Sequence, residues 1–363
     1  MSDQPQNIHT PSEDNLPAWD TTPVKLKKHL RGNTILLIVI SVFLIGAASV
    51  VLFVNSKLNK LNYDEQIETL SHEDILELND QELDKSLQNL EQRDQAPTPA
   101  EGDVFKDKDI VNILVCGTDM RIPNTQDQGR CDAAVIVSLN KKTGGVKLIS
   151  FERSIGIPTP GYGDTKLNGA FNLGGGEYLQ EVLTKCFLVD LAGYVHLSYE
   201  TIPEVFDAIG GIDVELDQSE VYHISRYVQY DLDAPELHVG MNNLRGWAAY
   251  GYCRLRDGDD NFARQRRVRN ALQAAVSKLK TMSLSDLNTM ADTVLPLIGT
   301  NLTKAQISSL ILMAPKFKNA TIEQLSVPEK DEGWSYQSPS GEYMLGLDYS
   351  EWSQKIQDFI SEK

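Results

Sequence analysis

The sequence has few of the residues that build disulfide scaffolds and zinc sites. Four cysteines in 363 residues are too few for a disulfide framework. Cys116 and Cys253 lie in apolar runs, where a small buried side chain is the simpler interpretation and a Cys116–Cys131 bridge is the alternative. The six histidines are scattered, and no Cys/His spacing typical of zinc ligands occurs.

Positive charge is also scarce. The chain has 34 Lys and Arg against 51 Asp and Glu, a formal net charge of -17. Non-specific nucleic-acid binding relies on a broad basic surface, which such a composition does not provide. We therefore expect no nucleic-acid partner.

Against this background, six arginines fall between positions 254 and 269: Arg254, Arg256, Arg264, Arg266, Arg267 and Arg269. The planar guanidinium forms two-point hydrogen bonds with phosphate oxygens, so the cluster is a candidate phosphate site; a solvated basic helix face is the alternative. Arg254 and Arg256 point to one face if their backbone is extended. Arg264 and Arg267 share one face of a helix, and we expect Arg266 and Arg269 to lie off it, exposed to solvent.

One long apolar run predicts a membrane anchor. Thr34 to Val54 carries no charged side chain, and at about 1.5 Å per residue its length matches a hydrocarbon core of roughly 30 Å. Lys25, Lys27, Lys28 and Arg31 precede it, so the positive-inside rule places residues 1–33 in the cytoplasm. A cleavable signal peptide is the alternative, but the run is longer than the usual apolar core and begins late. We expect a single-pass membrane protein with an extracytoplasmic C-terminal domain.

The remaining chain divides into a spacer and one large domain. Residues 1–33 are predicted to be a disordered tail, residues 55–109 a helical stalk and linker, and residues 110–363 the domain. Apolar runs predict strands at 111–116, 133–139, 146–151, 194–198 and 212–216. Helical patterns cover 177–187, 201–209, 242–252, 262–281, 284–297 and 303–313. Interleaved strands and helices predict an α/β fold with a mixed central sheet flanked by helices.

Polar residues lie where the predicted strands end, which is where α/β sheets place their sites. The first strand runs into Asp119, and the second is entered through Arg130 and Asp132. The third leads into Arg153. Mg²⁺ commonly binds one or two carboxylates together with substrate phosphates, so Asp119 and Asp132 are candidate metal ligands.

Seven motifs in order resemble the LytR-CpsA-Psr proteins of Gram-positive cell walls. The resemblance covers about residues 109–279, and more loosely the C-terminal remainder. Its motifs are Asn112-Ile-Leu-Val-Cys-Gly-Thr-Asp119, Arg130-Cys-Asp-Ala133, Phe151-Glu-Arg-Ser154, Asp164-Thr-Lys-Leu-Asn-Gly-Ala170 with Gly174-Gly-Gly176, Gly210-Gly-Ile-Asp-Val214, Leu244 to Arg256, and Phe262-Ala-Arg-Gln-Arg-Arg267.

The resemblance implies a phosphotransferase. Such proteins move a glycopolymer from a polyprenyl-pyrophosphate carrier in the membrane to peptidoglycan, with Mg²⁺ and with the lipid tail in an apolar tunnel between sheet and helices. Carried over by position, Asp119 and Asp132 would hold Mg²⁺. The pyrophosphate ligands and catalytic arginines would be Arg130, Arg153, Arg254, Arg256, Arg264 and Arg267, with Asp132 among the catalytic residues.

The sequence departs from the family pattern at several positions. Ser154 replaces the acid of the family's Pro-Arg-Asp motif, and Cys131 replaces a serine. Asn261 stands where an Asp is frequent, with Asp259 or Asp260 as substitutes, and Val268 replaces a glutamine. These changes leave one alternative open, a weakened enzyme or a protein that only binds the lipid pyrophosphate. A transcription regulator and a structural wall-binding protein are further rivals. The first is disfavoured by the short cytoplasmic segment, and the second has no need of acids beside the arginines.

Overall fold

The computed structural model describes residues 53–63, 87, 90–119, 129–159, 163–228, 236–255, 261–317 and 319–362. The chain divides into two compact units, Met1–Phe53 and Val54–Lys363. Only the last two residues of the expected membrane span, Thr34–Val54, fall within the described ranges. Among the helices of those ranges, none has the length and apolar character needed to cross a membrane.

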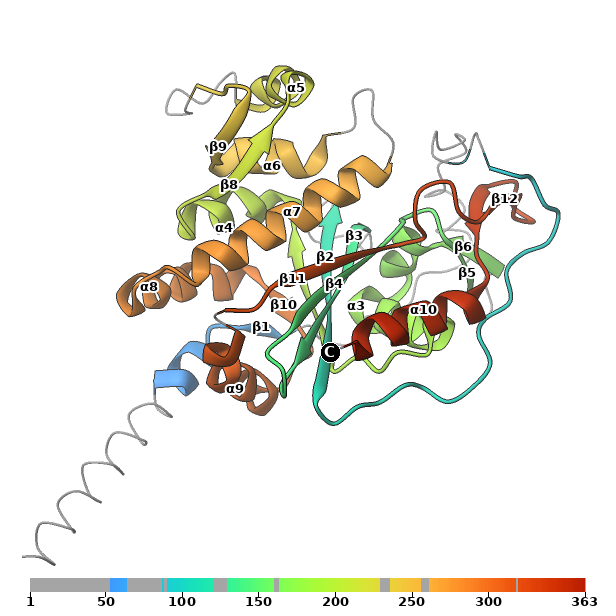
Figure 1. Cartoon of the computed structure of the whole chain (residues 1–363), viewed down its shortest axis with the longest axis horizontal. Coiled ribbons are helices and arrows are strands. Elements are labelled where there is room, and N and C mark those ends of the chain that lie inside the picture. The colour runs from blue at the N-terminus through green and yellow to red at the C-terminus, as the bar shows by residue number, and fades with distance from the viewer. Residues whose placement is uncertain are drawn as a thin grey trace, which may run out of the picture. The chain divides into compact units, whose positions relative to one another are not determined.

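A seven-stranded mixed sheet forms the centre of the second unit (Figure 1). Its order is β1-β10-β7-β2-β3-β4-β11, with β2/β3 and β3/β4 antiparallel and β2/β7 and β4/β11 parallel. The strands span β1 Asn62–Tyr63, β2 Ile110–Asp119, β3 Arg130–Asn140, β4 Val146–Phe151, β7 Gly193–Ser198, β10 Gly299–Thr300 and β11 Ile322–Val327. Three two-stranded sheets surround it: β5 Gly156–Thr159 with β6 Gly163–Lys166, β8 Ile212–Leu216 with β9 Gly240–Leu244, and β12 Trp334–Gln337 with β13 Tyr343–Gly346.

Helices cover both faces of the central sheet, so its inner strands are apolar on both sides. Every residue of β4 is buried. Figure 1 shows α3 and α10 on one side and α7 with α4 and α8 on the other. The helices are α3 Leu167–Phe187, α4 Ile202–Ala208, α5 Gln218–Val228, α6 Gly246–Arg254, α7 Asn261–Leu279, α8 Leu284–Val294, α9 Lys304–Met313 and α10 Tyr349–Ser361.

Two apolar clusters hold these layers together. The larger packs Leu183 and Phe187 of α3 and Ile356 of α10 against sheet residues such as Ile149. The smaller joins α4, α6 and the β8/β9 hairpin to α7. All four cysteines are free and buried, so they are small core side chains rather than bridge partners.

The expected α/β fold with a mixed sheet and flanking helices is confirmed, and β4 and β8 have the predicted bounds. The prediction of a helix at 242–252 is wrong for its first residues, which belong to strand β9. Asn242 and Leu244 alternate inward in β9, and Gly246, at φ 45°, separates this strand from α6. The strand at 212–216 forms a hairpin with β9 instead of joining the central sheet. Nine further elements were not predicted: β1, β5, β6, β10, β11, β12, β13, α5 and α10.

Two parts of the predicted stalk pack on the domain. Asn62–Tyr63 pairs with β10 at the sheet edge. Leu87 is buried in the larger core cluster, and the Arg93 amide donates to the Ser335 carbonyl at 2.8 Å. No helix occurs in residues 90–109. In these parts the chain packs against the domain.

The helix predicted at 177–187 is the second half of α3, which begins ten residues earlier. The first half was not predicted, because three glycines interrupt its apolar periodicity. Gly175 has φ 64° and ψ -157°, outside the helical region, and marks a kink. Gly176 lies against the ring of Tyr194, where a Cβ would meet ring carbons at 2.4 Å. The kink therefore depends on a backbone without side chains.

Gly176→Ala is expected to lower the free energy of unfolding by about 1–3 kcal/mol, because the added methyl group overpacks the contact with Tyr194. Gly169→Ala in the same helix is the control, since a Cβ added at this position would have nothing within 4 Å. That change should be neutral or stabilise the protein by up to about 1 kcal/mol. Denaturant unfolding measures both, and equal effects would contradict the assigned contact.

Candidate phosphate-binding site

A β-bulge places Asp132 at the centre of the site. Gly117 pairs with Ala133 and Thr118 pairs with Cys131, so Asp132 is the extra residue of β3 and has no partner in the β2 register. A bulge bends its strand and redirects a side chain. The Asp132 side chain is buried, with 5% of its surface exposed.

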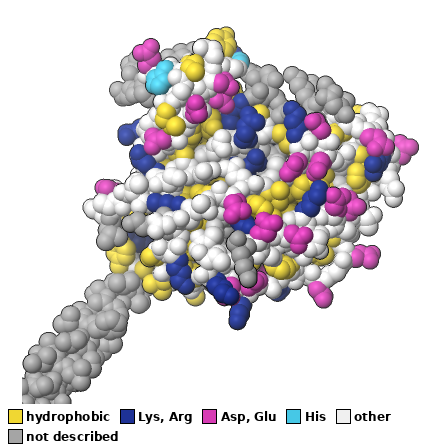
Figure 2. Space-filling model, in the orientation of Figure 1, with side chains coloured by type: hydrophobic (Ala, Val, Ile, Leu, Met, Phe, Trp, Pro, Cys, Tyr) yellow, Lys and Arg dark blue, Asp and Glu magenta, His cyan; other side chains and the backbone are white. Residues whose placement is uncertain are grey.

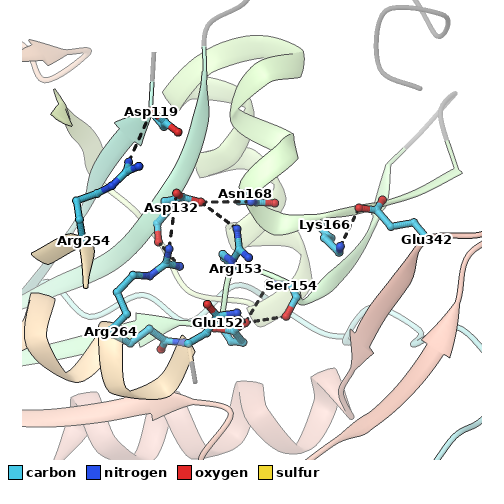
Figure 3. Close-up of polar contacts among 12 residues, drawn as sticks. Asp119, Asp132, Glu152, Arg153, Ser154, Lys166, Asn168, Arg254, Arg264 and Glu342 are labelled. Carbon is cyan, nitrogen blue, oxygen red and sulfur yellow. Dashed lines mark hydrogen bonds and ion pairs between the residues drawn. The ribbon is translucent and has the colours of Figure 1, made fainter. Parts of the chain in front are cut away.

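Three elements bring polar side chains to Asp132 (Figure 3). Nη1 of Arg153, in the turn after β4, lies 3.5 Å from Oδ1, and Nη1 of Arg264, on α7, lies 3.6 Å from Oδ2. Nη2 of Arg264 also donates to the Asp132 carbonyl at 3.2 Å, and Nδ2 of Asn168 on α3 donates to Oδ1 at 3.4 Å. Sequence positions 132, 153, 168 and 264 thus meet at one end of the sheet.

Arg254, the last residue of α6, forms a second ion pair beside this group. Its Nη1 lies 3.6 Å from Oδ1 of Asp119 at the end of β2. Its guanidinium stacks on the Tyr199 ring, 4.5 Å from the centroid. The Nη1 atoms of Arg254 and Arg264 are buried and have no hydrogen-bond acceptor in the described part of the chain. Both guanidiniums are thereby suited to an anionic ligand with acceptor oxygens.

The other candidate arginines divide into separate groups. Arg130 starts β3 directly opposite Asp119 and is half-buried. Arg256 lies outside the described residues, as do Asp259 and Asp260. Arg267 turns away from the Asp132 contacts: its Nε donates to Oε1 of Glu220 at 2.7 Å, and its Nη1 donates to the Leu255 carbonyl at 3.2 Å.

The expectation that Arg269 is exposed to solvent is wrong. Its Nε donates to Gln324 of β11 at 3.0 Å, and its Nη1 donates to Ser150 of β4. Burial and the neighbouring Arg266 lower the pKa of Arg269 to about 10. Arg269 therefore fastens α7 to the sheet, whereas Arg266 is exposed as expected.

Glu152 is a site residue that the sequence did not predict. It directly follows the last residue of β4 and is fully buried. Its carboxylate accepts hydrogen bonds from Ser154, Asn261 and Gln265. One signal was present in the sequence. The acid missing at Ser154 reappears two positions earlier, where the family motif has proline.

An apolar cavity of about 210 Å³ lies beside the site, between the sheet and the helices. Its walls come from β2 and β3 on one side and from α4, α7 and α8 on the other; lining residues include Val135, Val205, Phe206, Ala271, Ala275 and Met290. Tyr199 also lines it, so one ring touches both the cavity and Arg254. Burial, and secondarily Asp132, raises the pKa of the Tyr199 phenol, which keeps it neutral.

The two acids fit a magnesium ion by their chemistry. Asp119 and Asp132 stand on neighbouring strands at the sheet end where the arginines gather (Figure 3). Their ion pairs of 3.5 and 3.6 Å are longer than the 2.7–2.9 Å typical of charge-assisted hydrogen bonds. Two carboxylates plus phosphate oxygens form a ligand set that Mg²⁺ accepts. Groups of three or more His, Cys, Asp or Glu suited to a metal are absent from the described ranges.

The fold and site define an α/β protein with a cluster of arginine and aspartate side chains beside an apolar cavity. The LytR_cpsA_psr family model matches residues 69–358, so the chain belongs to the LytR-CpsA-Psr family.

Among curated relatives, the polyisoprenyl-teichoic acid–peptidoglycan teichoic acid transferase TagU of Bacillus mycoides is 27% identical over 260 residues, 68% of this chain and 80% of the relative. TagT of Bacillus subtilis, with the same transferase name, is 26% identical over 258 residues, 70% of this chain and 76% of the relative.

Solved structures show the same fold. TagT bound to LIIa-WTA matches with a TM-score of 0.56 at 23% identity, over 70% of this chain and 90% of the other. A TagT structure with bound octaprenyl pyrophosphate lipid matches with a TM-score of 0.53 at 21% identity, over 70% and 89% of the two chains.

Arg267→Ala is expected to lower the free energy of unfolding by about 3–5 kcal/mol, because it leaves the Glu220 carboxylate buried without its cation. Arg266→Ala, one position earlier on the same helix and exposed, is the matched control and should change stability by less than about 0.5 kcal/mol. Chemical denaturation tests both, and a neutral Arg267→Ala would refute the structural pair.

Proposed function

We propose that this chain transfers a glycopolymer from a polyprenyl-pyrophosphate carrier to peptidoglycan, forming a phosphodiester with the help of Mg²⁺. One observation carries the proposal: the arginine and aspartate cluster lies beside an apolar cavity, and Tyr199 lines the cavity while its ring contacts Arg254. A lipid pyrophosphate has a charged head and an apolar tail, and it needs both environments side by side. The names of the teichoic acid transferase relatives support the same assignment.

The site residues have distinct tasks in this reaction. Arg153, Arg254 and Arg264 bind the two phosphates and neutralise the charge that develops during transfer. A hydroxyl group of peptidoglycan attacks the phosphorus next to the glycan, the bond to the bridging oxygen breaks, and polyprenyl phosphate leaves. The departing polyprenyl phosphate takes up the proton that the hydroxyl group loses. Asp119 and Asp132 would hold Mg²⁺, which supplies Lewis-acid stabilisation of phosphoryl oxygens when bound.

The proposal includes the location of the chain. The apolar run Thr34–Val54 and the basic residues before it support a single-pass anchor with the domain outside the cytoplasm, where a membrane-embedded carrier and the cell wall are both reachable. A reporter fused after Lys363 should be active only outside the cytoplasm. Cytoplasmic activity would remove the basis of the proposed reaction.

The function is tested by incubating the purified chain with a polyprenyl-pyrophosphate glycan and peptidoglycan. Release of polyprenyl phosphate and a new phosphodiester are expected with Mg²⁺ and should largely disappear with EDTA or in Asp132→Asn. Tight lipid binding without release would support the binding-only alternative that the Ser154 and Val268 departures leave open. Neither binding nor release would reject the proposal.

Replacing Arg254 with Ala should weaken binding of octaprenyl pyrophosphate at least about tenfold, since a charge-assisted hydrogen bond contributes about 1.5–3 kcal/mol. Arg254→Lys should restore the affinity only in part, because an ammonium group lacks the two-point geometry. Arg266→Ala serves as the control for loss of one positive charge. Calorimetry measures the three affinities, and similar losses at 254 and 266 would indicate a diffuse basic surface.

Filling the cavity should affect the lipid tail selectively. Ala275→Phe introduces a ring into the space between α7 and the sheet, so affinity for octaprenyl pyrophosphate should fall at least about fivefold, or 1 kcal/mol. Affinity for inorganic pyrophosphate should stay within twofold. Ala305→Phe makes the same change on an exposed position of α9 and should leave both affinities unchanged. An unaltered octaprenyl affinity in Ala275→Phe would place the tail elsewhere.

A further inference from the structure

Glu152 is a buried carboxylate surrounded by hydrogen-bond donors. Its side chain is 0% exposed, and Oε1 accepts from Ser154 Oγ at 2.7 Å and from Asn261 Nδ2 at 3.1 Å. The Ser154 amide also donates to Oε1 at 3.4 Å, and Gln265 Nε2 donates to Oε2. Four donors directed at two oxygens complement an acceptor-only carboxylate.

These donors come from two segments that carry site arginines. Arg153 stands between Glu152 and Ser154 in the turn after β4, and Arg264 stands between Asn261 and Gln265 in the first turns of α7. One carboxylate therefore ties the start of α7 to the end of β4. These are the places from which both guanidiniums reach Asp132 (Figure 3).

Further hydrogen bonds tie this junction to the neighbouring strands. The Glu152 amide donates to the Val327 carbonyl at 2.8 Å, and the Ser154 carbonyl accepts from the Leu345 amide at 2.9 Å. Oε1 of Gln265 accepts from Ser150 and Ser326, at 3.2 and 3.3 Å. A negative charge near the N-terminus of α7 also interacts favourably with the helix dipole.

We propose that Glu152 is a positioning residue that holds Arg153 and Arg264 in the arrangement that receives the pyrophosphate. Its carboxylate takes the place of the acid missing at Ser154, and Ser154, Asn261 and Gln265 are its donors. The inference rests on the proposed function for the identity of the ligand. The junction itself rests only on the contacts of this chain.

Glu152→Gln is the direct test, because it keeps the shape of the side chain but replaces one acceptor oxygen with a donor facing Gln265. In the full chain, affinity for octaprenyl pyrophosphate should fall at least tenfold, whereas affinity for octaprenol, which lacks phosphates, should stay within twofold. Equal losses for the two lipids would mean a merely structural role and would overturn the proposal. Unchanged affinities would overturn it as well.

Rescue and control variants sharpen the result. The double variant Glu152→Gln with Ser154→Asp restores a carboxylate at the junction. Its affinity for octaprenyl pyrophosphate should recover at least half of the loss, measured on a logarithmic scale. The double variant Glu152→Gln with Ser154→Asn should show no such recovery. Glu342→Gln is the matched control, since Glu342 is also buried but pairs with Lys166 at 2.9 Å, away from the arginines. It should leave the preference for pyrophosphate over octaprenol intact. If Glu152→Gln does not fold, Ser154→Ala removes one donor and should show a smaller, equally selective loss.

A second readout does not need the lipid. Nitrogen-15 relaxation of the guanidinium Nε–H groups in the free chain should show lower order for Arg153 and Arg264 in Glu152→Gln, with Arg267 unchanged. Unchanged order at Arg153 and Arg264 would overturn the positioning role. A wild-type chain that binds no prenyl pyrophosphate would reject the proposed function instead, while this measurement would still decide the role of Glu152.

Discussion

The rest of the site depends on the Asp132 carboxylate, which pairs with two arginines. Arg153 and Arg264 bring two cations to one nearly buried carboxylate. Two like charges about 4 Å apart repel by about 4 kcal/mol at an effective dielectric constant of 20, so a shared carboxylate stabilises a pair of neighbouring guanidiniums. The bulge in β3 supplies it by turning one residue out of the strand register. On the visible face of the domain, acidic and basic side chains are mixed, without one broad basic area (Figure 2). The arginine cluster at the sheet end is therefore a local feature built from defined contacts with Asp132, and not part of a broad basic surface.

The arginines of helix α7 have different roles because they lie on different faces of the helix. Arg264 turns to Asp132, Arg267 to Glu220, and Arg269 to the sheet at Ser150 and Gln324, while Arg266 faces solvent. Successive positions are about 100° apart on a helix, so neighbouring arginines must meet different surroundings. The number of arginines in the sequence therefore overstates how many of them contribute to the candidate phosphate site. The role of each one follows from the contacts of its side chain.

The sequence predicted those features that depend on local pattern. Buried strands such as Val146–Phe151 and Ile212–Leu216 are short apolar runs with clear ends, and the motif residues Asp119, Asp132, Arg153, Arg254 and Arg264 do gather at one sheet end. Glycines hid the first half of α3, and β9 is a polar strand stabilised by pairing with β8. Glu152 could not be assigned, because its donors Asn261 and Gln265 lie 109 and 113 residues away. The bulge at Asp132 was equally invisible, since register is a property of two paired strands.

Tyr199 is the point where the two chemical environments of the site meet. Its ring lines the apolar cavity and carries the Arg254 guanidinium on one face, an arrangement that favours a cation through the ring quadrupole. Its hydroxyl is buried and has no hydrogen-bond partner in the described parts of the chain. A buried hydroxyl without a partner is costly, and a phosphate oxygen held by Arg254 would provide the missing acceptor. Because burial keeps this phenol neutral, Tyr199 can donate to an anion on one side and contact a hydrocarbon chain on the other. The amphiphilic carrier proposed above would therefore satisfy this residue and the arginines together.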